Sequence, residues 1–173
     1  MSSRNTFVRS LHDLGLATWF GGSLMGAVGL NGATAKAHDT SERLRLSSLG
    51  WARWAPVTAA AVGAHAVGSL GLIAGNSARL AHQDEARSST AVKTVLTVAA
   101  AGATVWSGIL GAKIASAAEE GGKGVTEPSA SSSQELAGAQ RQQKLLQWAV
   151  PALTGVLVVL GAQQGEQQRR LPR

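Results

Sequence analysis

The sequence contains no cysteine and no tyrosine, and it has few charged residues. The lack of cysteine excludes a disulfide framework, thiolate zinc sites, iron–sulfur clusters and a cysteine nucleophile. Charged residues make up 15% of the chain, which is below the quarter or so that is usual in a soluble domain. With so few charges in the chain, their distribution becomes its most informative feature.

Four long stretches contain no Asp, Glu, Lys or Arg at all: residues 14–35, 54–78, 94–112 and 145–165. Each is long enough to cross a hydrocarbon core of about 30 Å as a helix that rises about 1.5 Å per residue. The mean hydropathy is only +0.06, because Ala and Gly are abundant, and these small residues let membrane helices approach closely. A soluble bundle would need a charged face on each helix, which these stretches do not provide.

The pattern predicts an all-α fold, a four-helix bundle of an integral membrane protein. We expect one domain over residues 1–173, with transmembrane helices at about 8–32, 54–79, 92–114 and 145–164. Four spans place both termini on the same side of the membrane. The glycine- and serine-rich segment 119–142 is expected to be a loop that is mobile in its first half. Thr40 or Ser41 is expected to cap a short helix that ends at Gly50.

Two features of the first span and its orientation leave alternatives open. Arg4 and Arg9 before the apolar run, and small residues at 33–35, are compatible with a cleaved signal peptide, although the run is longer than the usual 7–15 residues. Basic residues that flank the four spans number 8 on each side, so the positive-inside rule does not fix the orientation. Uncompensated arginines beside the termini favour termini in the cytoplasm. We expect a multi-pass protein of a bacterial plasma membrane.

Small residues recur at helical spacing within the spans, which predicts faces where helices pack closely. The alternative is a self-association face or a groove for a flat cofactor or a lipid. The glycines assigned to helix packing are Gly15, Gly22, Gly26, Gly29, Gly68, Gly75, Gly108 and Gly111.

His65 is the only titratable side chain deep inside a predicted span, and such residues in membranes are functional candidates. It is either a neutral imidazole bonded to Ser69, Thr104 or Thr154, or a proton relay or metal ligand. His12, His65 and Trp19 are the candidate cofactor-binding residues. However, we expect His12 at the membrane edge and His65 about 20 Å deeper, which argues against joint ligation of one iron.

A second set of candidate ligands lies on the side of the termini. His12 and His82 are the candidate metal ligands there, with Asp13, Asp84 and Glu85 close to them in sequence; borderline divalent metals accept such groups. The alternative is a solvated polar rim.

Sequence signatures of catalysis are missing. Residues 102–111 carry glycines but no Walker lysine, Gly21-Gly22-Ser23 is not a nucleophile elbow, and the charge-free stretches hold no carboxylate for proton coupling. We therefore expect no enzymatic activity. The +6 charge flanks the spans, which favours anionic lipid headgroups over nucleic acid as its partner.

The segment from Leu11 to Gly22 carries a recognisable pattern: His12, then six residues, Trp19, one residue and Gly21-Gly22. It resembles uncharacterised four-helix integral membrane proteins of actinobacteria and, more distantly, the copper-resistance D-type membrane domain. The second resemblance covers about a dozen residues and implies a role in copper handling. The chain departs from a metal transporter because it lacks Cys and has only two methionines, Met1 and Met25.

These observations lead to two functional hypotheses. The first is a non-enzymatic accessory or interaction subunit, whose partners are the bilayer and either a second copy or another membrane protein. It needs no cofactor. The second is a membrane module that binds or transports a small solute, haem or copper through His12 and His65.

Overall fold

The computed structural model describes residues 3–169, and the surroundings of side chains at 6–77, 81–85 and 87–165. Within these residues the chain is helical and forms no β-strand. The long helices are α1 (Ser3–Met25), α3 (Thr40–Gly75), α5 (Asp84–Ser116) and α6 (Gln134–Arg169); the short elements are η1 (Gly26–Leu30, a π-helix), α2 (Asn31–Thr34), α4 (Ser77–His82) and η2 (Ala118–Glu120). The predicted all-α class with four long helices is confirmed.

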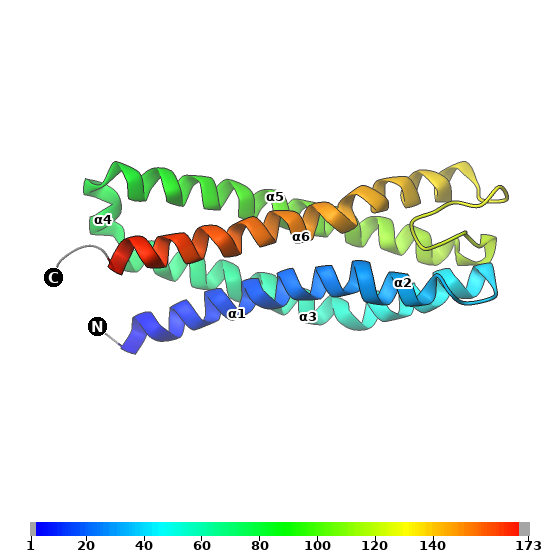
Figure 1. The fold of residues 1–173 in the computed structure, drawn as a ribbon, viewed down its shortest axis with the longest axis horizontal. Helices are drawn as coiled ribbons and strands as arrows, with labels where there is room; N and C mark the ends of the chain where they lie inside the picture. The colour runs from blue at the N-terminus through cyan, green and yellow to red at the C-terminus, as the bar shows by residue number, and fades with distance from the viewer. Residues whose placement is uncertain (1–2, 170–173) are drawn as a thin grey trace.

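The four long helices run side by side in an elongated bundle (Figure 1). The bundle is closed because α1 packs most extensively against α3, α5 packs against α6, and the α1–α6 and α3–α5 contacts join the two pairs. The start of α1, the end of α6 and the short helix α4 lie at one end, which we call the terminal end. The loop that connects α5 to α6 lies at the opposite end, the loop end (Figure 1).

Helix α3 is longer than the sequence predicts at its first end. The carboxylate of Asp39 accepts hydrogen bonds from the backbone N–H groups of Ser41 and Glu42, which makes Asp39 the N-cap in place of the expected Thr40 or Ser41. The helix then continues through Gly50 and Pro56, whereas we expected a separate short helix that ends at Gly50. Gly50 packs against the side chain of Leu30. Tertiary packing of this kind overrides the weak intrinsic helix propensity of glycine.

Three of the four long helices are long and apolar enough to cross a membrane: Thr40–Gly75, Arg87–Ser116 and Gln134–Gly165. Helix α1 is not among them. Its first half carries Arg9, His12 and Asp13, and the apolar run that follows continues past Met25 into the π-helical segment and α2. The apolar residues of this region are therefore divided among α1, η1 and α2, and α1 contains only part of them.

The bundle has an apolar exterior and a partly polar interior. Only 11–22% of the residues in each of the three most apolar helical windows are buried within the protein. Leucine, isoleucine and valine side chains are instead exposed along all four long helices. The buried polar side chains include Asn31, Ser47, His65, Gln143 and Thr154. A protein in water normally shows the opposite distribution.

The loop end is closed by the chain between α5 and α6. Residues 121 and 122 and 124–126 are buried, although their composition predicts a mobile segment. The guanidinium of Arg43 donates a hydrogen bond to the backbone carbonyl of Lys123 at 2.9 Å. The side-chain amide of Gln140 donates to the backbone carbonyls of Gly124 and Val125. The predicted loop 119–142 is too long, because α6 begins at Gln134.

Candidate functional site

Helices α1 and α3 meet through two matching histidine–glycine pairs. Each helix carries a histidine followed three residues later by a glycine: His12 and Gly15 on α1, His65 and Gly68 on α3. A Cβ atom on Gly15 would lie 2.6 Å from the backbone nitrogen of His65, and one on Gly68 would lie 2.5 Å from that of His12. Each glycine thus packs against the backbone beside the other helix's histidine, and the two backbones approach closely.

This approach brings the two histidine rings into contact. Their centroids are 4.3 Å apart, with the ring planes inclined at 41°. The sequence argument that placed His65 far deeper than His12 was wrong. His12 is nine residues from the start of α1, and His65 is ten residues from the end of α3 at Gly75. The start of α1 and the end of α3 both lie toward the terminal end of the bundle (Figure 1). Because the two histidines are nearly equally far from these helix ends, they lie at nearly the same depth.

His65 is buried, and each of its two ring nitrogens has an oxygen partner. His65 is 1% exposed; its Nδ1 lies 3.3 Å from the backbone oxygen of His12, and its Nε2 lies 3.3 Å from Oγ1 of Thr97. Because a carbonyl only accepts, Nδ1 carries the proton and Nε2 accepts from the hydroxyl of Thr97. The partner is Thr97, rather than the expected Ser69, Thr104 or Thr154.

His12 and Trp19 complete this cluster from the α1 side. Nδ1 of His12 donates to the carboxylate of Asp13 at 2.7 Å. The indole of Trp19 is buried, lies 6.1 Å from the ring of His65 between centroids, and donates to Oγ1 of Thr104 at 3.0 Å. The three candidate cofactor-binding residues, His12, His65 and Trp19, are therefore close together in the structure.

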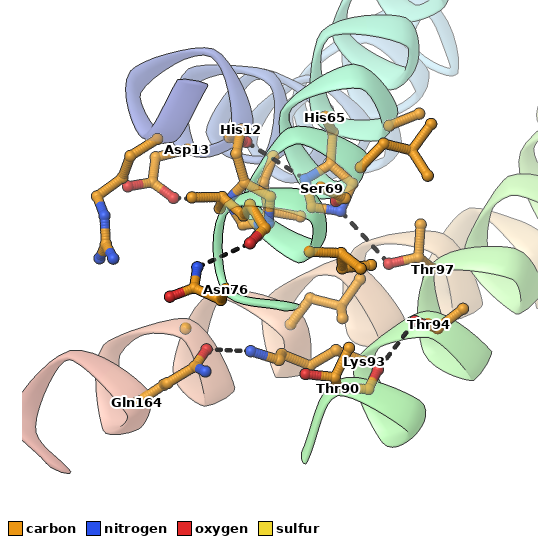
Figure 2. Close-up of a pocket in the computed structure, with 18 of the residues that line it drawn as sticks. His12, Asp13, His65, Ser69, Asn76, Thr90, Lys93, Thr94, Thr97 and Gln164 are labelled. Carbon is orange, nitrogen blue, oxygen red and sulfur yellow. Dashed lines mark hydrogen bonds and ion pairs between the residues drawn. The ribbon is translucent and has the colours of Figure 1, made fainter. Parts of the chain in front are cut away.

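The histidine pair forms one wall of a cavity of about 340 Å³ near the terminal end, between α1, α3, α5 and α6. Figure 2 shows Thr97 bonded to His65, and Thr94, Lys93 and Gln164 farther from the histidines. The amino group of Lys93 donates to the side-chain oxygen of Gln164. The volume lies at the lower end of the range of about 300–1,000 Å³ for ligand pockets. The side chains that line the cavity include Arg9, His12, Asp13, Leu16, His65, Ser69, Leu70, Ile73, Asn76, Thr90, Lys93, Thr94, Thr97, Val98, Leu157 and Gln164.

The arrangement of His12 and His65 does not fit a metal or haem iron held between them. Metal–nitrogen bonds of about 2.0–2.1 Å to ligands on opposite sides separate the two nitrogens by about 4 Å, and the ring centroids by more. The rings here touch at 4.3 Å, and both nitrogens of His65 have protein oxygen partners.

The second candidate metal set does not assemble either. His82 lies exposed on α4, whereas His12 packs on His65 inside the bundle. No group of three or more His, Asp or Glu residues suited to a metal forms among the residues that the structure describes. Sequence proximity of such residues does not bring their side chains to one point.

Four of the eight candidate packing glycines lie at helix contacts. Gly15 and Gly68 face backbone, as above, and Gly22 and Gly26 face the rings of Trp54 and Trp51 of α3. Those two tryptophans therefore pack against α1 and the start of η1. The other four candidates differ: Gly29 has only Met25 beside it, Gly75 is exposed, and a Cβ on Gly108 or Gly111 would meet nothing described within 4 Å.

Comparison with known proteins gives no relative. No protein-family model matches the chain, and no curated protein or solved structure is similar to it. The argument for function therefore depends on the cavity itself.

Several cavity residues were missed at the sequence level: Arg9, Lys93, Thr97 and Gln164. The sequence places Arg9 and Lys93 among the charges that flank the predicted spans, and this position alone does not show that both line one cavity. The signal that was available is the repeated His-x-x-Gly pattern at His12 and His65, because a histidine and a glycine on one helical face, present twice, favour a reciprocal contact of two helices.

Proposed function

We propose that this chain is a non-enzymatic integral membrane protein that binds a small molecule in the cavity at its terminal end. The observation that carries the proposal is a cavity of ligand size with a polar wall of His12, His65 and Thr97, inside a bundle whose exterior is apolar. Pockets that combine mostly apolar walls with a few convergent polar groups are the usual binding sites of proteins.

The proposed setting is a bacterial plasma membrane, crossed four times with both termini on one side. Three helices of suitable length and apolarity support this topology. For α1, support comes from its packing along α3 and α6, with η1 and α2 continuing its course to the loop end (Figure 1). The exposed side chains of Leu24 and Met25 of α1 and of Val28 of η1 also support it. An exposed apolar surface of this extent is stable in lipid and unstable in water.

A cavity-filling substitution tests the proposal. Gly161 lines the cavity, and a Cβ there meets no described atom within 4 Å, so Gly161→Phe is expected to fill the space without disturbing the helices. Mass spectrometry of small molecules extracted from the purified protein should find a bound compound in the wild type and none in Gly161→Phe. Gly63→Phe, at an exposed glycine of α3 with open space around it, is the control and should retain the compound. Equal content in all three proteins would refute the proposal.

A second proposal is an accessory subunit that contacts another membrane helix through α5. It is favoured by Gly108 and Gly111, three residues apart on α5, where nothing in the described chain comes within 4 Å of an added Cβ. Small residues on a lipid-facing surface allow a second helix to approach. Gly108→Leu should abolish crosslinking to a second copy or a partner in membranes, and Gly63→Leu should not. If neither variant changes the crosslinks, α5 does not mediate assembly.

A further inference from the structure

Two cations line the cavity without a matching anion. Arg9 projects from α1 and Lys93 from α5, and both line the cavity. Lys93 is half-buried, and its amino group donates to the neutral amide of Gln164. Among the residues whose side chains the structure describes, neither cation forms an ion pair with a carboxylate. A half-buried charge without a counter-ion is costly.

Asp13 carries the one carboxylate of the described lining, which balances only one of the two positive charges. This carboxylate accepts the hydrogen bond from Nδ1 of His12 at 2.7 Å. Figure 2 shows Lys93 and Gln164 together on the side of the cavity away from the histidines. The described lining thus holds two cations, Arg9 and Lys93, and one carboxylate, that of Asp13, and this excess of positive charge favours an anion as the ligand.

The cavity also opens toward the apolar exterior of the bundle. Leu70 of α3 and Val98 of α5 line it, and they are 67% and 66% exposed. Helices α3 and α5 pack against each other less extensively than α1 and α3 do. A ligand whose polar end reaches the cations therefore has an apolar exit between these two helices.

We propose that the cavity binds an anionic amphiphile with an acyl chain, its carboxylate or phosphate headgroup held by Arg9 and Lys93. The acyl chain leaves the cavity between Leu70 and Val98 toward the hydrocarbon. This inference rests on the proposed function, since it names the chemical class of the ligand for the same cavity. The headgroup is that of either a free fatty acid or a bilayer phospholipid, because both offer the same charge and an acyl chain.

The test is binding of radiolabelled dodecanoate to the full-length protein in nanodiscs of zwitterionic phosphatidylcholine. Dodecanoate should bind saturably, dodecyl phosphate should compete, and neutral dodecanol should compete at least tenfold more weakly. Lys93→Gln and Arg9→Gln should each weaken binding about tenfold, as expected for a lost charge-assisted hydrogen bond. Lys93→Arg should restore it. Arg53→Gln removes an exposed arginine of α3 that does not line the cavity, and should bind like the wild type.

The outcomes separate this inference from the proposed function. If Gly161→Phe abolishes dodecanoate binding but both glutamine variants bind like the wild type, the cavity binds ligands without the cations and the inference is overturned. If Gly161→Phe also binds normally, the proposed function fails as well. Nanodiscs that contain anionic phosphatidylglycerol distinguish the sources: weaker dodecanoate binding there identifies a bilayer lipid as the competing ligand, and unchanged binding identifies the free amphiphile.

Discussion

The contact of His12 and Gly15 with His65 and Gly68 shows how single residues set the distance between two helices. A glycine beside each histidine removes the Cβ atom that would otherwise separate the backbones. The imidazole of His65 is then enclosed, and its two nitrogens bond to the backbone of His12 and the hydroxyl of Thr97. The polar wall of the cavity is thus a consequence of close backbone packing.

The first prediction concerns these two glycines. Gly15→Ala and Gly68→Ala should each destabilise the protein by about 1–3 kcal/mol, because the added methyl group would clash with backbone atoms that cannot move independently. Thermal unfolding in detergent measures the effect. Gly108→Ala, where the added methyl meets no described atom within 4 Å, is the control; it should be neutral or slightly stabilising because alanine favours the helix. Equal unfolding temperatures for all three would contradict the close contact.

At the scale of elements, the π-helical segment η1 places a polar side chain in the interior. In a π-helix each hydrogen bond spans five residues in place of four. Here the backbone N–H of Asn31, directly after η1, donates to the carbonyl of Gly26. The buried side chain of Asn31 accepts hydrogen bonds from Ser47 Oγ at 3.0 Å and Trp51 Nε1 at 2.9 Å, and donates to Gln147 at 3.1 Å. One amide therefore connects the chain after α1 to both α3 and α6.

The second prediction tests this connection. Asn31→Leu should destabilise the protein by more than about 2 kcal/mol, because it leaves polar groups of Ser47, Trp51 and Gln147 without their partner in the interior. Gln142→Leu removes a comparable amide that is exposed on α6 and bonds only locally and to Trp106, and should cost little. Chemical unfolding in mild detergent compares the two variants, and similar losses would show that the Asn31 network contributes no special stability.

The third prediction uses the N-cap of α3 and its pH dependence. The hydroxyl of Ser41, followed by the backbone N–H groups of Glu42 and Ser41, lowers the pKa of Asp39 below its ordinary value of 3.8. The folded-state pKa is then lower than the unfolded one, so the contribution of the carboxylate to stability is present above pH 3.8 and lost as the pH falls through the folded-state value.

Unfolding temperatures of the wild type and Asp39→Asn between pH 2.5 and pH 7 provide the measurement. The variant keeps a capping oxygen but has no charge to titrate, so the advantage of the wild type should be constant near neutral pH and should shrink below about pH 4. A difference that does not change over this range would exclude a role for the charge of Asp39.

At the scale of the whole molecule, the exterior is apolar and the interior is partly polar, and three helices are long and apolar enough to cross a membrane. The loop end is closed by a buried segment, and the residues that line the cavity come from the halves of the long helices toward the terminal end. The two ends of the bundle therefore differ.

The fourth prediction is the topology. The chain lacks cysteine, so single cysteines are unambiguous markers. Ser88, in the first turns of α5, and Ser131, in the loop between α5 and α6, are exposed at opposite ends of the bundle. A membrane-impermeant maleimide should reach Ser88→Cys and Ser131→Cys from opposite sides in intact cells. Labelling of both from the same side would exclude a bundle that spans the bilayer.

The helices themselves could be predicted from the sequence with good accuracy. Stretches without charge favour helices in an apolar setting, since such a helix satisfies all its backbone hydrogen bonds locally. This local cause explains why the positions of α3, α5 and α6 follow the charge-free stretches. Local signals were weaker at helix ends, where Gly50 was expected to end a helix and Gln134 to lie in a loop. There, contacts such as those of Arg43 and Gln140 with the buried loop decide the structure.

The sequence by itself determined the helical class and the approximate positions of the long helices, because these depend on residues that are near one another along the chain. Only the tertiary structure decided that His12 meets His65, and that Arg9 and Lys93 line one cavity. Those neighbours depend on the relative shift of antiparallel helices, which is set by where each helix ends and by the close backbone contact at Gly15 and Gly68. A shift of one turn, about 5.4 Å, would separate every one of these pairs without changing any local sequence pattern.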